Sequence, residues 1–221
     1  MKNRLLFILT IFIFCCFVKG NAQYIRFGIQ AGAGIASAFN YYPKNNDLKD
    51  DPEMKLHNSP ILSYSSNLYI SYPLNDVYSI AVEPGLIRKG FSNQFFDGYD
   101  ELYNRNFLYY FQLPVLLEFK FDRPITLSIG PEFGYLLSAK LKEKYDTELM
   151  DLMHYYRKNR VDLGLQGGGF YSFSENFDFG LKIGFSFTNL DKFYLGDTEG
   201  YMLTEIRRKA LYINAFTRYK F

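Results

Sequence analysis

Histidine is a common metal ligand and acid-base catalyst near neutral pH, and this chain of 221 residues has only two, His57 and His154. Asp51 and Glu53 precede His57, and Asp151 precedes His154, so each histidine could share a metal or acid-base site with a carboxylate. Neither spacing matches a recognised motif such as H-E-x-x-H. We therefore favour histidines solvated among ordinary loop charges over catalytic or metal-binding ones.

Other candidates for chemistry are weaker still. Ser59 lies near His57 but lacks the G-x-S-x-G context of an activated nucleophile. The glycine-rich pieces 31–34 and 167–169 lie inside strand patterns with no following helix, so they indicate bends in a sheet and not phosphate cradles. The two cysteines, Cys15 and Cys16, fall in a leader segment. The sequence thus predicts no catalytic, cofactor or metal site.

The N-terminus has the three parts of a secretory signal peptide. Lys2 and Arg4 precede an apolar run over 5–18, and small residues follow in Gly20-Asn21-Ala22. A membrane anchor is the alternative, but 14 apolar residues are short of the ~20 that a spanning helix needs. We expect a signal peptide over 1–22 and a single mature domain over 23–221.

The net charge of that mature domain excludes one class of partner. Lys2, Arg4 and Lys19 belong to the leader, so 22 of the 25 basic residues remain against 23 acidic ones. The resulting formal charge of −1 offers no electrostatic basis for nucleic-acid binding.

The elements that would position any site are strands in which apolar and polar residues alternate. Between Phe107 and Phe121 every odd-numbered position is apolar and lies on one face, whereas Gln112, Glu118 and Lys120 lie on the other. Eight such segments occur, at 24–36, 61–72, 78–91, 107–121, 125–139, 160–173, 177–188 and 209–221. These segments exceed the ~9–11 residues with which a tilted strand crosses a membrane, so we expect them to project beyond it.

The connectors between these strands alternate in length. Long ones cover 37–60, 92–106, 140–159 and 189–208, and short ones cover 73–77, 122–124 and 174–176. This predicts an all-β fold, an eight-stranded antiparallel up-and-down transmembrane β-barrel with long extracellular loops.

The third long connector carries a second pattern. Leu149, Leu152, Met153 and Tyr156 have helical spacing within 143–156, so we expect a short amphipathic helix there. Such a helix could cover the barrel mouth or dock on a partner, and the simpler alternative is that it packs on its own loops.

The direction of the apolar face decides between a membrane barrel and a soluble lipocalin-like barrel, which would turn its apolar face inward. The apolar faces carry almost no charge in mid-strand, as hydrocarbon requires. The opposite faces mix small residues with charges of both signs, which cannot line an oily pocket. We expect the apolar face outward and a lumenal charge network of Glu83, Glu118, Glu132, Asp162, Asp178, Lys182, Lys120 and Arg218.

A simpler reading of the charged groups is that they are solvated at strand ends. We favour it for four cations, namely Arg26, Lys89, Arg218 and Lys220. The lumen of eight strands is just wide enough for side chains, so a general diffusion pore is not expected.

Several short motifs lie on the predicted strands. They are Ser79 to Gly90 with Glu83 and Lys89, Gln112-Leu113-Pro114, Gly130-Pro131, Gly134-Tyr135, Asp162 with Gly164 and Gly167 to Gly169, and the terminal Tyr219-Lys220-Phe221. In these residues the chain resembles the PorT-like, or outer membrane protein beta-barrel domain, family of Bacteroidota. The resemblance implies an outer membrane barrel, and some members of that family take part in protein secretion or gliding.

The expected function follows from this fold and location. We expect a non-catalytic protein of the cell outer membrane that acts in binding, assembly or surface interaction through its extracellular loops. Its expected partners are outer membrane lipid and an envelope protein that contacts the long loops. The alternatives are an outer membrane enzyme with catalytic groups at the extracellular rim, a component of an outer membrane secretion system and a soluble lipid carrier.

Overall fold

The protein is described by a computed structural model over residues 25–41, 57–96, 101–121, 124–143, 148–156, 160–190, 192–196 and 203–221. The signal peptide predicted for 1–22 lies outside these residues. Within them, no helix has the length and apolar character to cross a membrane.

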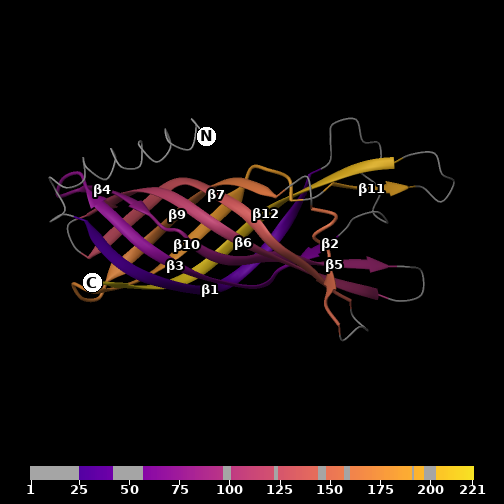
Figure 1. The fold of residues 1–221 in the computed structure, drawn as a ribbon, viewed down its shortest axis with the longest axis horizontal. Coiled ribbons are helices and arrows are strands. Elements are labelled where there is room, and N and C mark those ends of the chain that lie inside the picture. Colours follow the sequence, from indigo (N-terminus) through magenta and orange to yellow (C-terminus); the bar gives the residue numbers. More distant parts are fainter. Residues whose placement is uncertain are drawn as a thin grey trace, which may run out of the picture.

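Nine strands build the wall of a barrel (Figure 1). They are β1 (Arg26–Tyr41), β3 (Ile61–Pro73), β4 (Tyr78–Val82), β5 (Gly85–Phe96), β6 (Glu101–Lys120), β7 (Ile125–Lys142), β9 (Val161–Ser172), β10 (Phe177–Ser186) and β12 (Leu203–Lys220). β4 and β5 are two parts of one interrupted strand, because both pair with β3 on one side and with β6 on the other. The barrel is therefore eight-stranded. Three short strands, β2 (His57–Ser59), β8 (Met150–Asp151) and β11 (Lys192–Gly196), pair with β5, β7 and β12.

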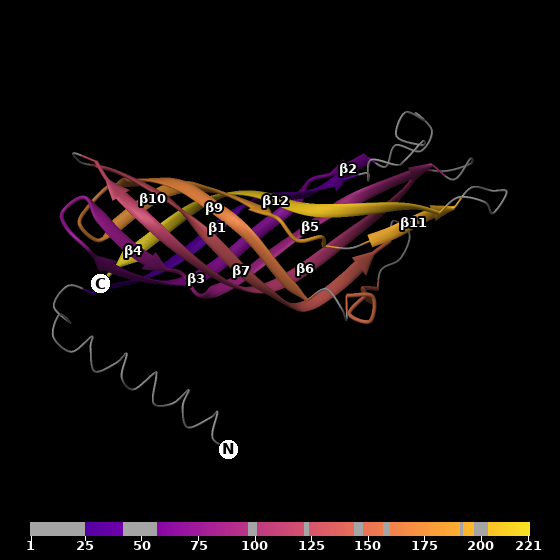
Figure 2. The same cartoon turned by 90° about the horizontal axis from the view of Figure 1, so that it is seen from above.

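The ring closes between the first and last strands. The pairing of β1 with β12 runs from Gly28 opposite Lys220 to Tyr41 opposite Arg207, and all wall pairings are antiparallel. Closure removes free strand edges inside the membrane, where no water can satisfy them. The predicted eight-stranded up-and-down barrel is therefore confirmed. Figures 1 and 2 show the tight turns and the C-terminus at one end, and β2, β5 and β11 at the other.

The strand that β4 and β5 form together is interrupted at Glu83 and Pro84. Proline cannot donate a backbone hydrogen bond, so it breaks the regular ladder at that point. Continuity is kept by two bonds, because Leu68 N–H donates to the Pro84 carbonyl at 2.9 Å and Glu83 N–H donates to the Pro114 carbonyl at 3.1 Å.

The two faces of the wall have opposite character. Along β10 every second residue is buried, beginning with Asp178, while Phe179, Leu181 and Ile183 are exposed between them. The same alternation sets exposed Leu117 against buried Glu118 on β6. Apolar side chains thus point away from the barrel axis and ionisable ones point toward it, as expected for a membrane barrel.

The prediction that residues 92–106 form a connector is wrong. β5 continues to Phe96 and β6 begins at Glu101, so only 97–100 separates the two strands. Twelve consecutive antiparallel pairs, ending with Phe96 opposite Glu101, hold this hairpin together. Cross-strand pairing therefore extends into a stretch whose polar composition had indicated a loop.

The predicted helix within 143–156 is also wrong for the described part of that segment. Met150 and Asp151 form β8 against β7, and a turn follows at 153–156. At this end of β7, pairing with β8 satisfies backbone groups that a helix could not satisfy. This tertiary pairing outweighs the helical spacing of the apolar residues. Tyr156 is nonetheless buried, with Leu152 and Met153 packed against the same hydrophobic cluster.

The face assignment makes a direct prediction for Leu117, which lies on the lipid-facing side of β6 within the apolar run from Phe107 to Phe121. Leu117→Arg should destabilise the barrel folded in bilayers by about 2–4 kcal/mol, because a cation would enter hydrocarbon. Phe121→Arg, just beyond the turn end of the same strand, is the matched control and should cost about 0–1 kcal/mol. Urea titration in vesicles, read by the gel mobility of unboiled samples, measures both. Equal costs for the two variants would contradict this orientation.

Candidate functional site: the lumen and its inner vestibule

The lumen is filled by long side chains that fit because small residues lie beside them. A Cβ atom at Gly32 would lie 2.4 Å from the ring of Phe216, and one at Gly184 would lie 2.2 Å from the ring of Tyr212. Glycine is therefore required at both positions for these rings to occupy the lumen. Both rings are fully buried and border the charged groups.

The first group of charges surrounds Arg218 on the last strand. Its guanidinium lies 2.9 Å from a carboxylate oxygen of Glu83, 3.1 Å from Glu118 and 3.6 Å from Asp178. Lys182 forms an ion pair with Glu83, and Lys220 lies 2.8 Å from Asp178. We call these six residues the Arg218 cluster.

The Arg218 cluster is balanced in charge, with three carboxylates and three cations. Glu83 and Lys182 are both 0% exposed, and Arg218 is 2% exposed. Charges at such depth are tolerated only when each has a partner. Gln30 completes the arrangement, because its carbonyl accepts from Arg218 Nε at 3.2 Å and from Lys182 Nζ at 3.3 Å while its amide donates to Glu83.

Aromatic rings and hydroxyls hold the cluster in place. The guanidinium of Arg218 stacks over Tyr69 at 3.7 Å and over Phe170 at 4.1 Å from the ring centroids. The Tyr69 hydroxyl donates to Glu118 at 2.8 Å, and the Ser79 hydroxyl donates to the same oxygen at 3.0 Å. Both carboxylate oxygens of Glu118 therefore accept hydrogen bonds from neighbouring side chains.

A second group of charges lies around Lys89. Its ammonium is 2.6 Å from Glu132 and 2.9 Å from Asp162. Asp162 also accepts from Ser186 at 2.9 Å and from Thr188 at 2.7 Å. We call Lys89, Glu132 and Asp162 the Lys89 cluster. Tyr212 donates to Glu132, and Gln166 donates to the Tyr212 hydroxyl at 2.7 Å.

The expectation that Lys89 is solvated at a strand end is wrong, since it is 1% exposed. The physical reason is the true length of its strand, which continues for seven residues beyond Lys89 to Phe96. The same expectation fails for Arg218, which is buried in mid-cluster, but Arg26 is exposed. Lys220 is partly exposed and reaches inward to Asp178.

The structure thus brings together most of the predicted charge network, in two groups. Glu83, Glu118, Asp178, Lys182 and Arg218 belong to the Arg218 cluster, and Glu132 and Asp162 belong to the Lys89 cluster. Lys120 does not join either group and forms no ion pair with any residue that the structure describes. It was assigned by strand alternation alone, which cannot distinguish mid-lumen from the mouth.

Toward the loop end apolar side chains predominate, although buried Arg208 lies there over the ring of Phe91. Inward-pointing residues of the wall pack with Tyr156 and Leu190 from the connectors in one buried cluster, whose other members are Ala36, Ala38, Ile87, Phe91, Leu108, Tyr110, Leu136, Ala139, Ala210 and Tyr212. We call this the loop-end plug. The lumen is therefore filled by charged side chains at one level and by packed hydrocarbon at another, an arrangement unlike an open pore.

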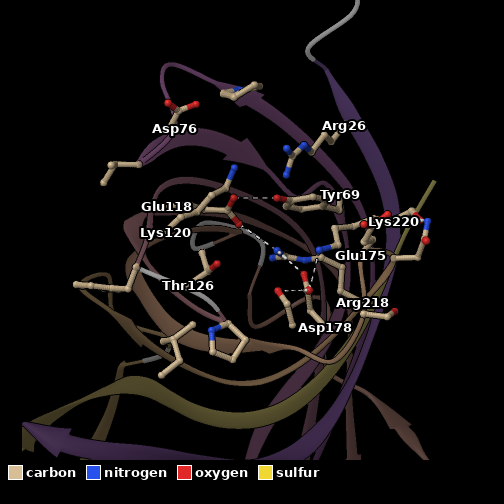
Figure 3. A pocket seen from close by; sticks show the side chains of 18 of the residues that line it. Arg26, Tyr69, Asp76, Glu118, Lys120, Thr126, Glu175, Asp178, Arg218 and Lys220 are labelled. Carbon is tan, nitrogen blue, oxygen red and sulfur yellow. Dashed lines mark hydrogen bonds and ion pairs between the residues drawn. The ribbon is translucent and has the colours of Figure 1, made fainter.

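At the opposite end the barrel opens into a cavity of about 1300 Å³, which we call the turn-end vestibule. Tyr69, Glu118, Asp178 and Arg218 line its inner part, as Figure 3 shows. Arg26, Lys120 and Lys220 also contribute to its lining. Alternation placed these side chains on the inward face, but the cavity itself carried no signal in the sequence.

The two histidines lie on different elements of the fold. His154 is exposed and its ring lies against Tyr155, with centroids 3.8 Å apart. His57 begins β2, and its side chain lies outside the described part of the structure. Ser59 ends β2 and pairs with Ser92. Among the described residues, no group of three or more histidine, cysteine or acidic side chains is placed to hold a metal ion.

Comparisons with known proteins identify a family. The family model described as "Outer membrane protein beta-barrel domain" matches residues 21–192, which is more than half of the chain. A search of curated proteins finds no match.

Solved structures with a related shape are distant. Neisserial surface protein A is 15% identical with a TM-score of 0.43, and the match covers 88% of this chain and 97% of that one. The attachment invasion locus protein Ail of Yersinia pestis is 14% identical with a TM-score of 0.38, covering 87% and 98%. The outer membrane protease OmpT of Escherichia coli is 10% identical with a TM-score of 0.38, covering 89% and 96%. At these values the similarities carry no functional argument.

Glu83 offers a test of the Arg218 cluster. Glu83→Gln should lower the free energy of unfolding by about 3–5 kcal/mol, because Lys182 would lose its ion pair inside the lumen. The double variant E83Q/K182M should cost less than the sum of the two single changes, since it removes the stranded cation as well.

The matched control is Glu175→Gln in an exposed tight turn, which should change stability by less than about 0.5 kcal/mol. Urea unfolding from vesicles measures the wild type, E83Q, K182M, E83Q/K182M and E175Q. If E83Q proves as mild as E175Q, the buried pair does not stabilise the barrel.

Proposed function

The chain belongs to the outer membrane protein beta-barrel domain family, and from that premise we propose that it is a non-catalytic binding protein acting through the surface at its loop end. It is an outer membrane protein. In barrels of this kind the short turns face the periplasm and the long connectors face the medium. The proposed binding surface is therefore extracellular.

The observation that carries this proposal is the extension of paired strands past the membrane. β6 has 20 residues, whereas about 9–11 cross the hydrocarbon. β5 stays paired with β6 out to Phe96, and β11 pairs with the start of β12 from Lys192 to Gly196. Strand ladders of this length hold a surface in a fixed shape, which lowers the entropy that binding must offset.

The interior supports a role that does not depend on passage through the barrel. The loop-end plug and the Arg218 cluster fill the lumen with packed side chains. The buried carboxylates are engaged by cations and hydroxyls, so they are poorly suited to proton transfer. These features favour a function at a surface of the barrel, and the loop-end surface is the one that faces the medium.

We also propose that the chain is one of the PorT-like members found in Bacteroidota. The support is the set of short motifs on the strands, among them Gln112-Leu113-Pro114 and the terminal Tyr219-Lys220-Phe221. The partner that we favour is an envelope or surface protein.

Photo-crosslinking in cells tests the binding proposal with two matched positions. Tyr155 at the loop end is 73% exposed, and Phe173 in a tight turn is 80% exposed. A photoreactive phenylalanine analogue at position 155 should give a discrete crosslinked protein band, and the same analogue at 173 should not give that band. Absence of a protein crosslink at 155, or the same band from both positions, would rule against the proposal.

The catalytic alternative is tested separately. The double variant H57A/H154A should keep the crosslink, because no chemistry is required for binding. Purified wild-type protein that cleaves lipid or peptide substrates, with loss of that activity in the double variant, would show an enzyme instead.

A further inference from the structure

Four basic side chains point outward from three adjacent strands near the loop end. They are Arg88 on β5, Arg105 on β6, and Lys140 and Lys142 on β7. Register places Arg105 opposite Lys142 and Phe107 opposite Lys140, whereas Arg88 lies opposite Tyr109, four residues farther from the loop end than Arg105. We call these four residues the loop-end basic patch.

A bulge in β7 is what turns the two lysines outward. Tyr110 pairs with Leu136 and Tyr109 pairs with Ser138, so Leu137 is an extra residue on its strand. An extra residue reverses which positions face outward beyond it. Lys140 and Lys142 are accordingly exposed, and Ala139 between them and the bulge is fully buried.

The patch begins where the apolar band of the wall ends. On β5 the outward residue Leu86 is followed by Arg88, and on β6 the outward residue Phe107 is followed toward the loop by Arg105. On β7 the exposed Leu137 is followed by Lys140. These positions correspond to the boundary between hydrocarbon and lipid headgroups.

Arg88 has the surroundings of an interface residue. Its Nε and Nη2 donate to the Leu62 carbonyl at 3.2 and 2.8 Å. Its guanidinium lies 4.5 Å from the ring centroid of Tyr64 and 5.0 Å from that of Phe107. Aromatic rings with one apolar and one wet side gather at this depth, so the arginine is held against the wall at headgroup level.

Acidic side chains do not neutralise the positive charge of the loop-end basic patch. Asp151 on β8 lies opposite Lys140, but its Oδ1 accepts from Met153 N–H at 2.7 Å, and Glu143 follows Lys142 in the chain. None of the four cations forms an ion pair within the residues that the structure describes. Four positive charges thus point outward near the end of the apolar band, and only Asp151 lies directly opposite one of them.

We infer that the loop-end basic patch binds the phosphate groups of phosphomonoester lipid headgroups in the outer leaflet. Arginine and lysine cations suit phosphate, and the arginine fork can engage two of its oxygens. The apolar wall that begins at Leu86 and Phe107 would receive the acyl chains of the same molecule, so one lipid would satisfy both surfaces. An acidic protein would match the charges, but at the edge of the apolar wall the molecules that surround the barrel are lipids.

Native mass spectrometry of the full barrel in neutral detergent tests this, with phosphatidic acid as the probe. Phosphatidylcholine and diacylglycerol serve as comparison lipids. Wild-type protein should retain phosphatidic acid above both, and more weakly at high salt because screening acts on exposed charges. The variant R105Q/K142Q should retain it about tenfold less well or worse.

The matched control is R26Q/K120Q, which removes two cations from the turn-end vestibule. It should bind phosphatidic acid as the wild type does, and unboiled gel mobility should show that both variants are folded. Equal retention by R105Q/K142Q and the wild type, or equal losses in the two variants, would overturn the inference. Displacement of the lipid by inorganic phosphate at the same phosphate concentration would also overturn it, because the patch would then hold an ion and not a lipid.

Discussion

The rest of the structure depends on one constraint, the narrow axis of a closed ring of eight strands. Such a ring has room for side chains but little for water, so a charge buried in mid-lumen must find its counter-charge within the protein. Arg218 meets this demand by contacting three carboxylates, and Lys89 by contacting two. Glycines such as Gly32 and Gly184 provide the space for the rings beside them. Outside, the same wall carries apolar side chains because its surroundings are lipid.

Much of this fold could be predicted because a membrane strand has two different faces. The alternation from Phe107 to Phe121 placed Leu117 outward and Glu118 inward without reference to any other strand. Charge of both signs on the inward faces implied pairing, and Glu83, Asp178, Lys182 and Arg218 do lie together. What alternation supplies is the side on which a residue lies.

Alternation does not supply the partner across the lumen or the true strand end. Lys89 pairs with Glu132 and Asp162 from distant strands, and those contacts depend on register around the whole ring. The helical spacing near Tyr156 reflected burial in the loop-end plug, which a turn achieves equally well. The extra residue at Leu137 has no distinctive signal in its sequence, yet it decides which way Lys140 and Lys142 point.

The place of Arg218 in the chain has a consequence for biogenesis. Arg218 lies on β12, the final strand. The three carboxylates that it contacts, Glu83, Glu118 and Asp178, all come earlier in the chain. A sheet that lacks β12 therefore holds Glu118 and Asp178 without their cations, while Glu83 already has Lys182 on β10. Docking of β12 onto β1 compensates these two carboxylates in the step that seals the seam. Seam formation and compensation of Glu118 and Asp178 thus coincide, which raises the free energy of an unsealed barrel in the bilayer.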